Sequence, residues 1–233
     1  MKLPEIIFET LAVGHLAVNC YIVGSKKDNT AIVIDAGGNP EEILNLLKKH
    51  NLDLKLIINT HAHFDHVGGV KPLQDLTGAK FLLHREDIPL LNYLNDQTDA
   101  FGLSPIPVPR VDRELADDEE IFIGNEAIRI IHTPGHSPGS ICFLLNDAVF
   151  VGDTLFAGSI GRTDLYGGSY TKIISSIKTR LFTLEDHVIV YPGHGTFTTI
   201  GEEKQHNPFF DLKNSISIFL MENFINLPIS CFV

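Results

Sequence analysis

Residues 59–69, NTHAHFDHVGG, place three histidines and one aspartate between positions 61 and 66. Imidazoles and carboxylates are ligands that zinc and iron take in proteins. Without a cation to share, four such side chains at a strand end would repel one another or remain unpaired. The cluster of His61, His63, Asp65 and His66 therefore predicts a metal site.

Three later segments offer side chains of the same kind directly after apolar runs typical of strands. HTPGHSPGS, residues 132–140, presents His132 and His136 in a loop stiffened by two Pro-Gly pairs. FVGD ends in Asp153, and YPGHG contains His194. Because each candidate lies just past a strand, we expect them to converge on one sheet edge. Isolated histidines such as His84 are expected to be surface or core residues.

The elements expected around these segments alternate between strands and helices. Three apolar runs rich in β-branched residues are typical of strands: 20–25, 30–38 and 54–60. Residues 39–50 between the last two are typical of a helix, with Asn39 as its cap and Pro40 at its first position. A strand, a helix and a strand predict a parallel pair joined by a crossover, so His61 follows the end of a buried strand.

The rest of the chain repeats this alternation. The further elements expected are helices at 71–78 and 170–182, strands at 79–84 and 187–195, and hairpins at 121–135 and 140–153. Residues 92–113 show no clear period and carry three prolines, which predicts a loop; a loop of that length favours a functional role. Two sheets, each covered by helices, are the architecture that this order indicates.

Composition excludes several classes of protein. The length of 233 residues suits a single domain, 1–233, and the net charge of −11 disfavours nucleic acid as a partner. The N-terminus is a poor signal peptide and no apolar run is long enough to span a membrane, so we expect a cytoplasmic protein without a membrane partner. The cysteines form no disulfide framework, and Cys20 and Cys142 are expected to be buried thiols.

The segments THAHFDH, HTPGHSPGS, GDTLFAGSIGRTD and YPGHG, in this order, resemble the metallo-β-lactamase superfamily. The resemblance covers residues 7–210 and is closest to the hydroxyacylglutathione hydrolase-like (glyoxalase II-like) branch, in its short bacterial type without the C-terminal helical domain. It implies an α/β fold, namely an αββα sandwich of two mixed sheets flanked by helices. It also implies a binuclear metal site at one edge of that sandwich.

Carried over by position, the resemblance implies which residue of this chain would bind each of the two metals. One metal would take His61, His63 and His136, the other Asp65, His66 and His194, and Asp153 would bridge the two. His132 falls outside this pattern and is expected to support the site or only its loop. Asp35, in VIDAGG, matches a family position behind the ligands. The expected cofactors are two divalent ions, zinc first, with iron or manganese as alternatives.

The implied reaction is hydrolysis of a small-molecule thioester, of the hydroxyacylglutathione kind, or of a related activated acyl substrate. A hydroxide bridging the two ions would be the nucleophile, because metal binding lowers the pKa of water from about 16 to about 7. Asp65 is the expected catalytic residue, which orients the hydroxide and later passes on a proton. The sequence does not indicate the oligomeric state.

Other features leave alternatives open. Arg162 and Asp164 stand where the family carries a glutathione-binding lysine and a tyrosine. Arg162 is therefore either a substrate-binding residue or the partner of Asp164 in a turn-shaping salt bridge. The GRTD stretch also resembles a persulfide dioxygenase branch that binds a single iron, and this is the alternative function. A lactonase and a non-catalytic metal-binding protein are further alternatives. Residues 211–233 form an apolar extension, expected to be a packed helix, a subunit contact or a lid.

Overall fold

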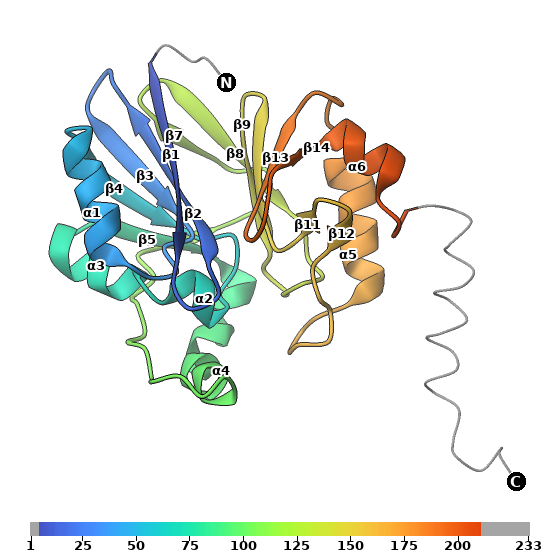
Figure 1. Ribbon diagram of the computed structural model, residues 1–233, viewed down its shortest axis with the longest axis horizontal. Helices are drawn as coiled ribbons and strands as arrows, with labels where there is room; N and C mark the ends of the chain where they lie inside the picture. The colour runs from blue at the N-terminus through green and yellow to red at the C-terminus, as the bar shows by residue number, and fades with distance from the viewer. Residues whose placement is uncertain (1–4, 211–233) are drawn as a thin grey trace, which may run out of the picture.

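Two six-stranded sheets face each other, and helices cover both outer surfaces (Figure 1). The computed structural model describes residues 5–210, so the predicted extension at 211–233 lies outside the described residues. The arrangement confirms the predicted αββα sandwich of two mixed sheets. Among the helices of residues 5–210, none has the length and apolar character needed to cross a membrane.

The first sheet is antiparallel at one side and parallel at the other. Its strands, in spatial order, are β1 (Ile6–Val13), β2 (Val18–Ser25), β3 (Thr30–Ile34), β4 (Asp53–Ile58), β5 (Lys80–His84) and β6 (Arg113–Leu115). Strands β3 to β6 are parallel, and the predicted crossover from β3 to β4 through α1 (Pro40–Lys49) is confirmed. Helices α1 and α3 (Val70–Thr77) supply the apolar side chains that cover this sheet, including Ile43, Leu47 and Leu73.

The second sheet is built mainly from two hairpins. Its strands, in spatial order, are β14 (Thr198–Thr199), β13 (Ile189–Pro192), β10 (Ala148–Gly152), β9 (Ile141–Leu145), β8 (Glu126–His132) and β7 (Glu120–Ile123). The two predicted hairpins are confirmed as β7–β8 and β9–β10. Two helices lie outside this sheet, α5 (Tyr170–Ser176) and α6 (Ile200–His206). Helix α5 continues as a π-helix over Ile177–Leu181. A short hairpin pairs β11 (Leu155–Phe156) with β12 (Ser159–Ile160).

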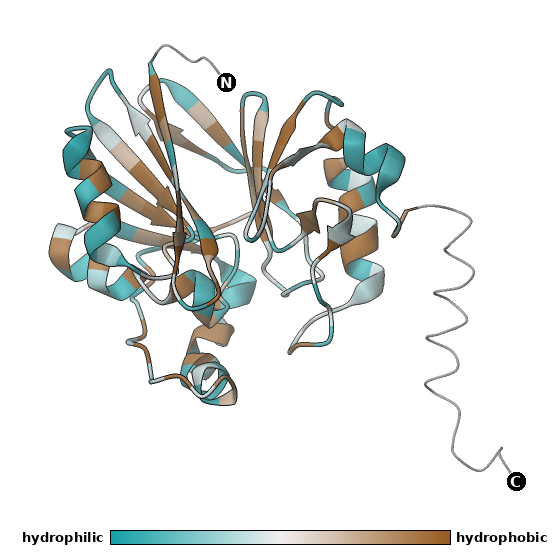
Figure 2. Ribbon diagram, in the orientation of Figure 1, coloured by the Kyte–Doolittle hydropathy of each residue, from teal (hydrophilic) through white to brown (hydrophobic). Residues whose placement is uncertain are grey.

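The main apolar layer lies between the two sheets. Ile58, Phe143 and Phe150 are fully buried there, and the Tyr21 ring packs on Phe150 with centroids 5.0 Å apart. Figure 2 shows hydrophobic strands inside and hydrophilic residues on the outer faces of the helices. Cys20 and Cys142 are buried free thiols, as predicted. The strands are thus held rigidly, and their ends can position polar side chains.

The prediction of a loop over residues 92–113 is wrong in part. A 3₁₀ segment over Arg85–Tyr93 leads into α4 (Leu94–Ala100), and only residues 101–112 lack regular structure. Helix α4 buries only Leu94 and Thr98, so its sequence carries too few apolar positions to reveal a helical period. The amide of Phe64 donates to Gln97 Oε1 (3.0 Å), which holds α4 against the segment that carries the clustered histidines.

Asn39 occupies the predicted position before α1, but its side chain does not cap the helix. Its backbone is left-handed (φ 50°), its Oδ1 accepts from the Gly14 amide (2.9 Å), and its Nδ2 donates to Glu42 Oε1 (2.6 Å). The side chain therefore ties α1 to the turn between β1 and β2. Pro40 begins the helix as predicted.

Candidate metal centre

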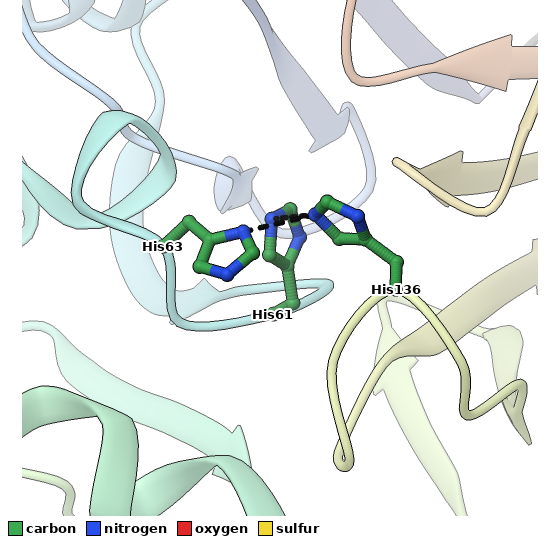
Figure 3. Close-up of side chains that lie close together, drawn as sticks. All are labelled: His61, His63 and His136. Carbon is green, nitrogen blue, oxygen red and sulfur yellow. Dashed lines mark hydrogen bonds between the residues drawn. The ribbon is translucent and has the colours of Figure 1, made fainter. Parts of the chain in front are cut away.

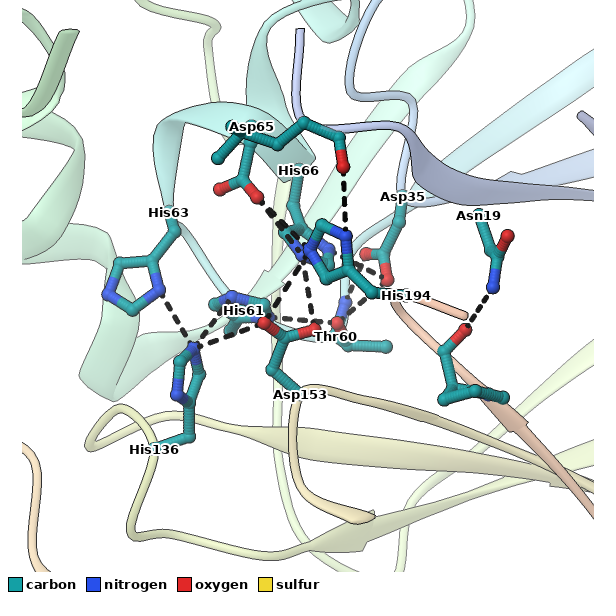
Figure 4. A network of polar contacts seen from close by, with 12 residues as sticks. Asn19, Asp35, Thr60, His61, His63, Asp65, His66, His136, Asp153 and His194 are labelled. Carbon is teal, nitrogen blue, oxygen red and sulfur yellow. Dashed lines mark hydrogen bonds and ion pairs between the residues drawn. The ribbon is translucent and has the colours of Figure 1, made fainter. Parts of the chain in front are cut away.

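All seven predicted ligands meet where strands of both sheets end (Figure 4). His61 and His63 follow β4, and the four-residue helix α2 (Phe64–Val67) carries Asp65 and His66. His136 follows β8, Asp153 follows β10, and His194 follows β13. Segments that are far apart in the chain therefore contribute to one site, because the two sheets present these strand ends at a common edge.

Three histidine rings form the first group (Figure 3). His136 Nε2 lies 3.2 Å from His61 Nε2 and 2.9 Å from His63 Nδ1. Burial lowers the pKa of His61 well below its usual range and that of His63 to about 3, and the neighbouring imidazoles add to both effects. Neutral rings whose nitrogens face one point offer the lone pairs that a metal ion requires.

Asp65, His66 and His194 form the second group. Asp65 Oδ2 lies 3.2 Å from His194 Nε2 and 3.8 Å from His66 Nε2. The buried atoms His66 Nε2 and Asp153 Oδ1 have no hydrogen-bond partner. Because unpaired buried polar atoms are costly, these orphaned atoms together with the first group fit a pair of metal ions.

Asp153 lies between the two groups. Its Oδ1 is 3.4 Å from His66 Nε2, and its Oδ2 is 3.7 Å from both His136 Nε2 and His194 Nε2. Burial raises the pKa of Asp153, but the surrounding imidazoles, led by His66, outweigh burial and hold it below its usual range. The ionised carboxylate can therefore reach ligands of both groups.

A glycine makes room for this contact. A Cβ on Gly193 would lie 2.3 Å from Asp153 Oδ1 and 2.7 Å from His66 Cε1. No other residue type fits without displacing one of these ligands. The glycine in YPGHG is thus required by the site as well as by its turn.

Asp35 lies directly behind the ligands. Its Oδ1 accepts from the Thr60 amide and its Oδ2 from Thr60 Oγ1, both at 2.8 Å. Its Oδ2 also lies 3.2 Å from His66 Nδ1. Because Thr60 Oγ1 donates to Asp35, it accepts from His61 Nδ1 (3.0 Å), which leaves His61 Nε2 unprotonated toward the first group. This geometry fits the supporting position expected for Asp35.

Sequence reasoning missed Asp87, which links the two loops of the first group. Its Oδ2 accepts from the Ala62 amide (2.9 Å) and from Ser137 Oγ (2.7 Å), and its Oδ1 accepts from the Gly139 amide (2.5 Å). The side chain is fully buried, and burial raises its pKa. No metal-binding motif surrounds it, so only its place between residues 61–63 and 136–139 reveals it.

Arg162 and His132 lie outside the ligand groups. The Arg162 carbonyl accepts from His136 Nδ1 (2.9 Å), while its guanidinium makes two hydrogen bonds of 2.7 Å to Asp164. Thus the predicted alternative of a salt bridge is present, and the Arg162 side chain also borders the cavity over the ligands. His132 Nε2 donates to the Pro138 carbonyl (2.9 Å), so it supports the loop that carries His136.

A cavity of about 590 Å³ opens over the ligand groups. His63, Asp65, His136, Asp153 and His194 contribute to its floor. Its walls come from the segment before α4, from α4 itself, from residues 162–166 and from the β1–β2 turn. A small molecule can therefore reach the candidate metal centre from solvent.

Two relatives match this chain over nearly their whole length. Hydroxyacylglutathione hydrolase GloC of Haemophilus influenzae is 39% identical over 210 residues, which cover 88% of this chain and 99% of that protein. The probable metallo-hydrolase YqgX of Bacillus subtilis is 35% identical, over 86% of this chain and 96% of that protein.

Solved structures agree with the fold. BLEG-1, a B3 metallo-beta-lactamase, superposes with a TM-score of 0.82 at 37% identity, over 88% of this chain and all of that one. TTHA1623 in a di-iron-bound form gives 0.79 at 37%, over 86% and 99%. ETHE1 from Myxococcus xanthus gives a TM-score of 0.77 at 30% identity, over 96% of this chain and 92% of that one.

The family pattern described as the metallo-beta-lactamase superfamily matches residues 13–194. Its sequence, its fold and its converging histidines and aspartates place this chain in the metallo-β-lactamase superfamily, to which relatives named as hydrolases also belong.

Proposed function

We propose that the protein is a binuclear metal-dependent hydrolase that cleaves a thioester or a related activated acyl bond. The position of Asp153 carries this proposal, because its two oxygens lie within 3.7 Å of ligand nitrogens from both groups. One ion would be held by His61, His63 and His136, the other by Asp65, His66 and His194, with Asp153 shared. The relationship to a hydroxyacylglutathione hydrolase supports the choice of a thioester.

Divalent ions bound there would supply a nucleophilic hydroxide near neutral pH and would polarise the acyl carbonyl. Zinc is the proposed metal, with iron or manganese as alternatives, since histidine and aspartate accept all three. Asp65 is the proposed catalytic residue. It lines the cavity, and although burial raises its pKa, the imidazoles of His66 and His194 together hold that pKa below the usual range. An ionised carboxylate here would orient the attacking water and then carry its proton to the leaving thiolate.

The test is the metal content of protein purified without added metal, followed by turnover of a panel of thioesters and lactones. The expected result is about two ions per chain and hydrolysis that a chelator abolishes and added metal restores. Preference for lactones would make the protein a lactonase. Full metal loading without turnover of any substrate in the panel would contradict the proposed hydrolase.

A second candidate is a mononuclear iron persulfide dioxygenase. His61, His66 and Asp153 form a third possible ligand group, and two imidazoles with one carboxylate are typical of mononuclear non-haem iron. The similarity to ETHE1 and the salt bridge of Arg162 with Asp164 in the GRTD stretch support this alternative. One iron per chain, with oxygen uptake on glutathione persulfide, would favour it over the hydrolase.

A further inference from the structure

Apolar side chains gather at the mouth of the cavity over the ligands. Nine large apolar side chains are exposed among residues 5–210, and five of these line this cavity: Leu16, Tyr93, Phe101, Leu165 and Tyr166. Leu90 continues the same wall as a buried residue. Exposed apolar side chains that cluster beside a site mark a binding surface. The clustering therefore calls for a ligand with an apolar part.

Besides the β1–β2 turn, which carries Leu16, two segments build this mouth. Figure 1 shows α4 and the segment from β12 to α5 extending from the same edge of the two sheets. The rings of Tyr93, just before α4, and Tyr166, just before α5, lie with centroids 5.8 Å apart. Phe101, at the end of α4, packs on Phe64 at 5.1 Å, which connects this wall to the segment that carries the ligands. The apolar surface is thus continuous from the mouth to the ligand groups.

Outside the ligand groups, the cavity lining offers few positive charges to bind the carboxylates of a ligand. Apart from the histidines, Arg162 is the only cationic side chain of the described lining, and Asp164 holds its guanidinium through two hydrogen bonds of 2.7 Å. Asp96 adds a carboxylate to the lining. A glutathione thioester carries two carboxylates, and the one guanidinium of this lining is already paired with the carboxylate of Asp164.

We propose that the substrate is a neutral thioester whose acyl group is apolar, and that Tyr93 and Tyr166 bind this group. The inference rests on the proposed hydrolase function and names its substrate class. The aromatic mouth would bind the acyl chain by excluding water, while the carbonyl lies over the ligand groups. The salt bridge of Arg162 with Asp164 would disfavour glutathione thioesters.

The experiment compares substrates on the metal-loaded full-length protein. N-acetylcysteamine thioesters with acetyl, butyryl and hexanoyl groups form a neutral series, and S-lactoylglutathione is the anionic probe. We expect kcat/KM to rise about twofold per added methylene, because a fully buried methylene contributes about fourfold and this mouth is half-exposed. The hexanoyl thioester should exceed S-lactoylglutathione by about tenfold.

Two kinds of variant connect the preference to these residues. Tyr166→Ala and Tyr93→Ala should each lower kcat/KM for the hexanoyl thioester about fivefold more than for the acetyl thioester. Phe122→Ala is the matched control, because Phe122 is 60% exposed on β7 and does not line the cavity. Asp164→Asn should free the guanidinium and raise the ratio of S-lactoylglutathione to hexanoyl turnover about threefold.

The outcomes separate this inference from the proposed function. Turnover that is insensitive to acyl length, or that favours S-lactoylglutathione, would overturn the inference and leave the hydrolase standing. An unchanged length dependence in both tyrosine variants would also overturn it. No turnover of any thioester by metal-loaded protein would overturn both.

Discussion

Two groups of neighbouring histidines in this protein differ in geometry. In the group His61, His63 and His136 the rings meet edge to face, at 85–89°, and their nitrogens approach to 2.9–3.2 Å. His84 and His132 instead stack face to face, with centroids 4.3 Å apart and planes 21° from parallel.

One nitrogen of each stacked ring has a backbone partner, whereas the nitrogens that converge in the other group face one another. His132 Nε2 donates to the Pro138 carbonyl, and His84 Nδ1 accepts from the Glu86 amide (3.4 Å). In the converging group, His136 Nε2 faces only other ligand atoms. Stacked rings with backbone partners need no cation, whereas converging lone pairs require one. Ring orientation and the partners of the ring nitrogens therefore distinguish the candidate metal centre from the structural pair.

The largest effect should come from removing the charge that the two ligand groups share. Asp153→Asn keeps the size of the side chain but leaves a neutral amide between the groups. We expect the metal content to fall from about two ions per chain to about one and kcat/KM to fall about 10³-fold. Elemental analysis and thioester kinetics measure both quantities. Asp147→Asn, on the exposed turn between β9 and β10, is the control and should change neither. Retention of two ions in Asp153→Asn would contradict the bridging role.

A smaller effect should come from the carboxylate behind the converging group. Asp87→Asn replaces one carboxylate oxygen by an NH₂ group. This group would face the backbone N–H of either Gly139 or Ala62, so that two donors would oppose each other. Weakening this link should lower metal affinity about 10- to 100-fold and stability by about 1–3 kcal/mol. Competition with a chelator and urea unfolding measure the two losses separately.

Asp99→Asn is the matched control for that variant, because Asp99 is exposed at the end of α4. Unchanged metal affinity in Asp87→Asn, with only lowered stability, would show that Asp87 supports the fold but does not position the ligands.

The convergence of the seven candidate ligands could be predicted from the sequence, because they come in short segments that follow recognisable strands. His61 to His66, His136, Asp153 and His194 all lie where the edge of a predicted strand places them. Asp87 could not be predicted in this way. Its three donors come from residues 62, 137 and 139, and only the packed fold brings these segments together.

The residues that form the cavity mouth could not be predicted from the sequence either. Helix α4 shows no period, since it buries only Leu94 and Thr98. Tyr93 and Tyr166 lie in different halves of the chain, and nothing local indicates that their rings meet. A predicted motif can reveal chemistry, whereas the surface that selects a substrate depends on contacts between distant segments.

The smallest effect tests the stacked pair through pH. Burial lowers the pKa of His84 from about 6.5 to about 4, and His132 adds to this effect. Below pH 6.5 the unfolded chain therefore binds a proton that the folded protein does not bind until about pH 4. Stability contributed by neutral His84 is complete above pH 6.5 and is lost as the pH falls through this window, by about 1 kcal/mol for a partly screened imidazole.

His84→Phe keeps a ring against His132 but removes the titration. The variant should therefore lose about 1 kcal/mol less stability than the wild type between pH 7.5 and pH 4, measured by urea unfolding at several pH values. Loss of metal on acidification affects both proteins and cancels in the difference. Parallel pH profiles would mean that His84 can be protonated in the folded protein without cost, and burial against His132 would then not hold His84 neutral.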